Sequence, residues 1–268
     1  MIQRVWALAL NTHREAIRQK ILYTLVFFSV TLVLFSLFLG QLSLGADVKI
    51  VMDMGLASMM IFGSIMAIFM GIGLVFKEID RRTIYTILTK PVSRSEFILG
   101  KFLGLATTIG LEVFSMSILL FGMLFLYREP LDFNLCKAIL LIYAELCVLI
   151  ALSLIFSSYS SSFMSALFCI SFLVIGHVTD DLGQIMGPKV ALILKDAEGT
   201  DRWGGNLLFA AIEVLQWFSL DHFAINAKIV HGVPVPWAWV IQSLFYGFCL
   251  IALLLSVAIY LFRKKDLR

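Results

Sequence analysis

The chain has 268 residues, of which 60% are hydrophobic and 15% are charged, and its formal net charge is +3. A water-soluble domain usually carries about 25% charged residues, so this chain has too little charge to cover a soluble surface. The small net charge argues against a nucleic-acid partner. Three of the four cysteines lie in apolar runs without C-x-x-C spacing, so neither a disulfide framework nor a zinc site is predicted.

Residues 1–20 are predicted to form an amphipathic helix in the membrane interface. Val5, Trp6 and Leu10 recur at helical spacing, with Arg4, Arg14 and Glu15 on the other side. The apolar run that follows, 21–42, is about as long as a bilayer-crossing helix and has no small-residue cleavage pattern. It is therefore predicted to be a permanent span and not a signal peptide.

Further continuous apolar runs predict an all-α polytopic membrane protein with one transmembrane domain over residues 1–268. The six predicted transmembrane helices are at about 21–42, 56–76, 97–126, 137–156, 163–179 and 239–262.

Lys and Arg are distributed unequally between the two sides of this arrangement. One side has Arg4, Arg14, Arg18 and Lys20, then Lys77, Arg81, Arg82, Lys90, Arg94 and Lys101, and finally Arg263, Lys264, Lys265 and Arg268. The short connections on the other side have Lys49, Arg128 and Lys137. The positive-inside rule therefore places both termini in the cytoplasm. We expect a multi-pass protein of the plasma membrane, the inner membrane of a bacterium.

Residues 180–238 form the one long connection, which this orientation makes extracytoplasmic. Its apolar parts are too short to span, and we expect re-entrant or interfacial helices there. Asp221 is a candidate cap for a short helix that ends at Gly232.

The second span repeats small residues every four positions, at Gly63, Ala67 and Gly71, which predicts close helix packing. A stripe of Met59, Met66 and Met70 runs beside them. It is interpreted as adaptable packing, and the alternative is a Cu(I) path, which would want Cys or His alongside.

Residues 77–96 form the most polar part of the first half of the chain. Ile84, Ile87 and Leu88 share one helical face, Pro91 ends this short helix, and Ser93 with Glu96 forms a capping box for the third span. Two interpretations remain open. The segment is either an ordinary basic loop lying on the membrane or a structured site for a soluble partner.

From Lys77 to Lys101 the sequence reads Lys-Glu-Ile-x-x-x-Thr-Ile-Tyr-x-Ile-Leu-x-Lys-Pro-Val-Ser-Arg-x-Glu-Phe-x-Leu-Gly-Lys. This pattern resembles the cytoplasmic loop of ATP-binding cassette permeases of the type-2, exporter-like family. The resemblance implies a coupling helix that docks on a separate ATPase subunit, and pairing with a second permease copy or a paralogue. The implied docking residues are Glu78, Arg81, Arg82, Tyr85, Leu88, Lys90 and Arg94, with Pro91 shaping the turn.

The sequence contains no P-loop, which requires G-x-x-x-x-G-K-[ST]. Its one Gly-Lys pair, Gly100-Lys101, has Ser95 at the first glycine position and is followed by Phe102. The chain is therefore predicted not to be an enzyme. ATP and Mg²⁺ would bind to the partner subunit, and no cofactor is expected in this chain.

Glu112 and Glu145 are the acids inside predicted spans, and helix geometry places them at similar depth. Acids in a membrane are functional candidates, so they are predicted to line a substrate path or to hold a proton. The alternative is a protonated, structural role. His177, Asp180 and Asp181 are too weak a pattern to predict a metal site.

The leading prediction is a permease subunit that moves an unidentified substrate outward, using ATP hydrolysed by another chain. The alternative is a non-transporting membrane module that couples a cytoplasmic ATPase to an extracytoplasmic protein bound by residues 180–238. An ion-driven carrier is less well supported, because no clear inverted repeat is visible.

Overall fold

The computed structural model describes residues 2–42, 47–80, 93–128, 133–178, 219–220 and 222–264. Its labelled helices are α1 (Ile2–Ile17), α2 (Lys20–Leu42), α3 (Asp47–Asp80), α5 (Arg94–Leu126), α6 (Phe133–Tyr159), α9 (Asn226–Val230) and α10 (Trp237–Lys264). A further helix covers Ser162–Val178. Within these residues all the regular secondary structure is helical, which confirms the predicted all-α class.

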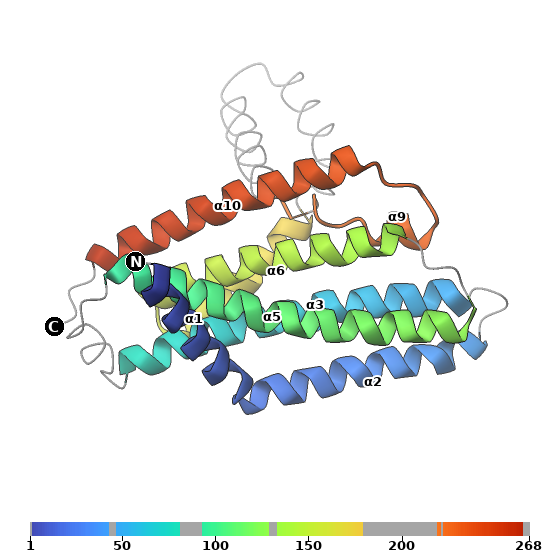
Figure 1. Cartoon of the computed structure of the whole chain (residues 1–268), viewed down its shortest axis with the longest axis horizontal. Helices are drawn as coiled ribbons and strands as arrows, with labels where there is room; N and C mark the ends of the chain where they lie inside the picture. Colours follow the sequence, from blue (N-terminus) through green and yellow to red (C-terminus); the bar gives the residue numbers. More distant parts are fainter. Residues whose placement is uncertain are drawn as a thin grey trace, which may run out of the picture.

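Five helices are long and apolar enough to cross a membrane, namely α2, α3, α5, α6 and α10. They run roughly alongside one another, and α1 crosses one end of the bundle at an angle (Figure 1). The predicted fifth span corresponds to the helix Ser162–Val178, which at 1.5 Å per residue is about 26 Å long and slightly shorter than a hydrocarbon core. The count of six spans therefore stays a prediction.

The second predicted span is longer in the structure than in the prediction, which placed it at 56–76. Helix α3 begins at Asp47, whose acidic side chain suits the positive end of a helix dipole. Val51 is fully buried, and Val48 packs against the core, so this first part of α3 belongs to the bundle. Lys49 consequently lies in a helix and not in a connection.

Helices α3 and α6 form the centre of the bundle, and they are the most buried of the five candidate spans. A β-carbon added to Gly63 would lie 2.7 Å from Leu146, and one added to Gly71 would overlap the Ser153 side chain. The predicted small-residue face is therefore a real contact of α3 with α6, where the absence of side chains lets the two helices approach.

The methionine stripe is part of the same core. Met59, Met66 and Met70 are all fully buried. No group of His, Cys, Asp and Glu that could hold a metal ion occurs among the residues whose positions are described. The burial of the three methionines favours the packing interpretation over the copper path.

The basic ends of the helices gather at one end of the bundle. The start of α1, the end of α3, the start of α5 and the end of α10 all lie there (Figure 1). The segment 81–92, which connects α3 with α5, also begins and ends at this point.

At the other end, α9 follows a short, well-packed turn in which Leu220 and Phe223 are fully buried. The chain stops being helical at Gly232, whose φ is +73° and whose amide donates to Ile229. This confirms the predicted helix end, because glycine adopts the left-handed conformation without a steric penalty. The predicted start of this helix is wrong, because α9 begins at Asn226, five residues after the proposed cap Asp221, and residues 222–225 are not helical. Asp221 itself and residues 179–218 lie outside the described residues.

Candidate functional site

Helix α1 is packed directly on the first turns of α5. A β-carbon added to Gly100 would lie 2.5 Å from Leu8, and one added to Gly104 would lie 2.6 Å from the carbonyl oxygen of Ala9. The two glycines are one helical turn apart, so together they form a flat strip along α5. Helix α1 is therefore fixed against a span, which a helix lying loosely on the membrane would not be.

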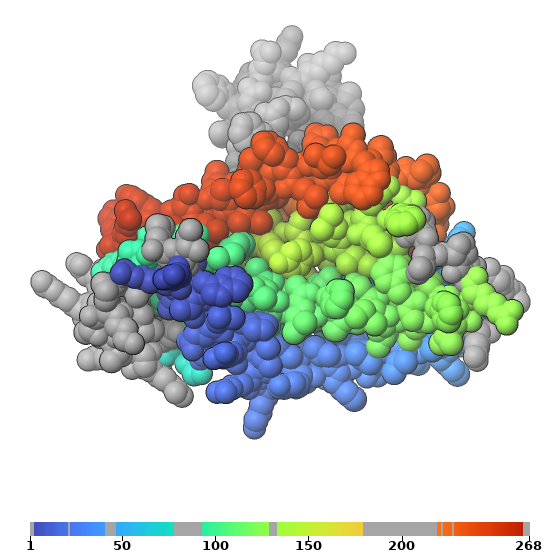
Figure 2. Space-filling model, in the orientation of Figure 1, coloured from blue at the N-terminus to red at the C-terminus, as the bar shows by residue number. Residues whose placement is uncertain are grey.

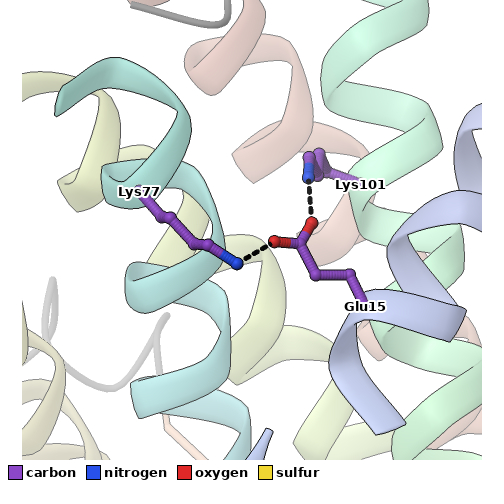
Figure 3. A network of polar contacts seen from close by, with 3 residues as sticks. All are labelled: Glu15, Lys77 and Lys101. Atoms are coloured by element: carbon purple, nitrogen blue, oxygen red, sulfur yellow. Dashed lines mark hydrogen bonds and ion pairs between the residues drawn. The ribbon is translucent and has the colours of Figure 1, made fainter. Parts of the chain in front are cut away.

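A charged cluster joins this contact to α3. One oxygen of Glu15 in α1 accepts a hydrogen bond of 2.5 Å from Lys77 in α3, and its other oxygen lies 4.0 Å from Nζ of Lys101 in α5 (Figure 3). The Lys77 side chain is 43% exposed, whereas that of Lys101 is 3% exposed. We call these three residues the Glu15 cluster. It holds α1 to both helices that flank the segment 81–92.

The start of α5 is also attached to the end of α10. The Arg94 guanidinium donates hydrogen bonds of 2.8 and 3.0 Å to the carbonyl oxygens of Phe262 and Arg263. The ring of Phe97 stacks on that of Phe262 with 5.5 Å between their centroids. A cation at the last carbonyl groups of a helix satisfies acceptors that have no partner within the helix. The start of α5 thus makes contacts with both α1 and α10.

The predicted capping box at the start of α5 is present. The amide of Glu96 donates to the Ser93 hydroxyl at 3.2 Å, and the Ser93 amide donates to the Glu96 carboxylate at 2.8 Å. This reciprocal pair satisfies two amides at the helix start and sets the direction in which the chain enters α5.

The structure describes only part of the predicted docking surface. Arg94 is the first residue of α5, and Glu78 lies in the last turn of α3, but nothing is described of the Glu78 side chain. The other predicted docking residues lie outside the described part of the chain, namely Arg81, Arg82, Tyr85, Leu88, Lys90 and Pro91. The docking role of all eight residues stays a prediction.

The first of the two membrane acids, Glu112, is buried in α5, with 5% of its surface exposed. Neither carboxylate oxygen has a hydrogen-bond partner among the described residues. It lies one turn after Thr108, which pairs with His13 of α1, and one turn before Met116, which accepts a hydrogen bond from Ser29 of α2. A buried acid without a partner is costly, so Glu112 remains a candidate for binding a proton or a substrate group.

The second acid, Glu145 in α6, is 1% exposed and lies beside His177 at the end of the Ser162–Val178 helix. The distance from Glu145 Oε1 to His177 Nε2 is 3.4 Å, an ion-pair distance without the geometry of a good hydrogen bond. The other ring nitrogen of His177 is 3.1 Å from the carbonyl oxygen of Leu173. Glu145 is therefore paired with an imidazole, which the sequence analysis did not predict.

The contacts support the prediction that the two acids lie at similar depth. Gly110, two residues before Glu112, packs against the ring of Tyr143, two residues before Glu145. The helices α5 and α6 run in opposite directions, so each two-residue step of about 3 Å carries the acids apart, and they differ in height by about 6 Å, or about one turn.

Sequence reasoning missed both Glu15 and the pairing role of His177. From the sequence, Glu15 was placed only on the polar side of an amphipathic helix. Its partners Lys77 and Lys101 lie on either side of the segment 81–92. His177 was considered only as a metal ligand. The pairing of Glu145 with His177 could have been predicted in the following way. An acid inside a span needs a polar partner, and His177 is the one histidine inside a predicted span.

The fold and the contacts at its basic end define a polytopic helical membrane protein in which the N-terminal helix α1 is fixed to the spans. Residues 6–267 match the family model described as "ABC-2 family transporter protein". Because this match covers nearly the whole chain, the chain belongs to the ABC-2 transporter family, as the resemblance of residues 77–101 implied. No curated protein matches the chain.

Membership defines the general role of the chain. The family is a membrane transport module and not a catalytic one, so this chain is a permease subunit of an ABC transporter. It also implies two partners, an ABC ATPase and the lipid bilayer in which the apolar helices lie.

Proposed function

We propose that this permease moves its substrate outward across a bacterial inner membrane, with both termini in the cytoplasm and with a second permease copy or a paralogue beside it. ATP would be hydrolysed by a separate subunit that docks on residues 77–96. The orientation is supported by the gathering of Lys and Arg at one end of the bundle, which is the end that the positive-inside rule assigns to the cytoplasm.

The observation that carries the proposal is the Glu15 cluster. Lys77 is the first residue of the proposed docking segment and Lys101 follows the segment, and both lie beside the same carboxylate of α1. Movement imposed on the segment by an ATPase would therefore reach α1, α3 and α5 together. Helices that pack together and share ion pairs in this way move as rigid bodies and not as independent elements.

Charge reversal tests the docking step. In the variant Arg81→Glu with Arg82→Glu, the full-length permease is expected to insert into the membrane but to lose co-purification with its ATPase. The control is Arg14→Glu with Arg18→Glu, which makes the same change in net charge. Arg14 lies in α1 and Arg18 directly after it, and both are exposed. Normal association of the first variant, or equal loss in the control, would contradict docking at this segment.

The alternative, a non-transporting module, depends on the external connection 180–238. Reconstitution of the permease and its ATPase in liposomes distinguishes the two. ATP turnover stimulated by a transported compound supports transport, whereas turnover that depends on an added external protein supports the alternative.

A further inference from the structure

A groove of about 370 Å³ opens between α5 and α6, a volume in the range of small-molecule sites. Its walls include Phe114, Ile118 and Phe121 from α5, and Cys136, Leu140 and Tyr143 from α6. Both helices reach the same face of the molecule, where α5 lies next to α6 (Figure 2). None of these residues belongs to the Glu15 cluster or to the two buried acids.

The polar atoms of the groove are already used within the protein. The Ser117 hydroxyl donates to the carbonyl oxygen of Val113 at 2.7 Å, and the Tyr143 hydroxyl donates to that of Ala106 at 3.2 Å. A ligand in the groove therefore meets hydrocarbon and aromatic surface. The chemistry of the walls favours an apolar chain and gives a polar ligand nothing to replace its water.

The groove faces the lipid and lies in the half of the bundle away from the basic end. Phe114 and Ile118 on its rim are 63% and 58% exposed, on a helix that is apolar enough to cross the membrane. At 1.5 Å per residue, Gly110 is about 24 Å and Phe121 about 40 Å from the start of α5 at Arg94. The groove is thus at the depth of the acyl chains of the leaflet opposite the basic end.

A cation lies beyond the outer end of the groove. Arg128 is exposed, has a φ of +57°, and comes two residues after Leu126, the end of α5, which is about 8 Å further along the helix than Phe121. Its guanidinium has no hydrogen bond or ion pair with the residues that the structure describes. An exposed guanidinium just beyond the helix that forms one wall of an apolar groove complements an amphiphile whose anionic phosphate lies at the membrane surface.

We propose that the α5–α6 groove binds one acyl chain of a phospholipid in the leaflet opposite the basic end, and that Arg128 binds its phosphate. The site is separate from the ATPase-docking segment, and phospholipid binding requires neither ATP nor the partner subunit.

Photolabelling of the full-length permease tests this site. The protein is reconstituted in vesicles of phosphatidylethanolamine and phosphatidylglycerol that contain a phosphatidylglycerol with a diazirine in the middle of one chain. After irradiation, mass spectrometry locates the adducts. We expect adducts on the groove walls in excess over the exposed faces of α2 and α10.

Two variants make the test specific. Leu140→Trp fills the groove and is expected to lower labelling of its walls about fivefold, the change produced by losing about 1 kcal/mol of binding. Leu253→Trp is the control, because Leu253 is an exposed leucine on α10, away from the groove, and labelling should not change. Arg128→Gln removes the cation at an exposed position outside the helix, and it should lower the same adducts without affecting folding.

Three results would overturn the proposal. Adducts spread equally over all exposed helices would mean bulk lipid only. Unchanged labelling of the groove in both Leu140→Trp and Arg128→Gln would mean that the chain binds elsewhere. Absence of adducts together with cross-linking of Cys136 between two permease copies would make this face a protein contact. Since no ATPase is present, the outcome is independent of the docking test above.

Discussion

The carboxylate of Glu145 and the imidazole of His177 lie 3.4 Å apart in the interior of the bundle, joining α6 to the helix that follows it. The Leu173 carbonyl oxygen can only accept a hydrogen bond, so His177 Nδ1 must carry a proton. The facing nitrogen, Nε2, lies at ion-pair distance from the carboxylate without forming a hydrogen bond with it. The two polar groups are therefore close electrostatic neighbours across the contact between the two helices.

This pairing predicts coupled stability effects. We expect Glu145→Gln and His177→Gln to be non-additive, with a coupling free energy of about 1 kcal/mol, because each removes the same interaction. Unfolding of the two single variants and of the double variant in detergent micelles measures it. Effects that add to within about 0.3 kcal/mol would show that the two side chains are merely neighbours.

The contact of α1 with α5 predicts opposite results for two glycines of one helix. Gly104→Ala is expected to lower the thermal stability, because its β-carbon would collide with the Ala9 carbonyl oxygen and with Thr12. Gly122→Ala is the matched control, since nothing lies within 4 Å of the added β-carbon. There, alanine should stabilise the helix by about 0.5–1 kcal/mol relative to glycine. Equal melting temperatures for the two variants would argue against the close contact.

A second pair of glycines tests the packing of α3 against α6. A β-carbon at Gly71 would overlap the Ser153 side chain, whereas one at Gly73 would meet no atom within 4 Å. We predict that Gly71→Ala destabilises the protein by about 1–3 kcal/mol, while Gly73→Ala is neutral or stabilising. Adding Ser153→Ala to Gly71→Ala should restore part of the loss, because it removes the hydroxyl oxygen from the overlap. The free energy of unfolding by denaturant in micelles provides the comparison.

The Glu15 cluster predicts that its two lysines contribute unequally. Lys77→Gln should cost less than about 1 kcal/mol, because this side chain is 43% exposed and exposed ion pairs are weak. Glu15→Gln should cost more, about 1–3 kcal/mol, because it also removes the nearby anion from the buried Lys101. Thermal unfolding at low and high salt checks both values, and salt should reduce only the Lys77 contribution.

The control for the cluster is Arg14→Gln, which changes an exposed charge next to Glu15 in the sequence. It should leave both stability and ATP turnover in the complex close to normal. If Glu15→Gln behaves like this control in both measurements, α1 is not linked to the helices around the docking segment through its carboxylate.

Much of the helical arrangement could be predicted from local sequence. Ser93 and Glu96 are close in the chain, so the capping box that starts α5 follows from spacing alone. The end of α9 at Gly232 is equally local. The early start of α3 at Asp47 was missed, because Asp47, Lys49 and Asp53 interrupt the apolar pattern, whereas the burial of Val51 in the bundle is a tertiary contact.

The candidate site was less accessible to sequence reasoning, because its partners are far apart in the chain. Glu15 and Lys77 are separated by 62 positions, and Arg94 and Phe262 by 168. A residue pattern shows that an acid or an arginine is present but does not show which distant helix will face it.

Apolar runs, helix signals and the distribution of Lys and Arg are properties of neighbouring residues. From them alone the sequence determined that this is a multi-pass helical membrane protein, and with the pattern of residues 77–101 it indicated the family. The tertiary structure decided which charges meet. The rotation and crossing of each helix depend on side-chain packing over the whole bundle, and this packing brings Glu15 to Lys101 and Glu145 to His177.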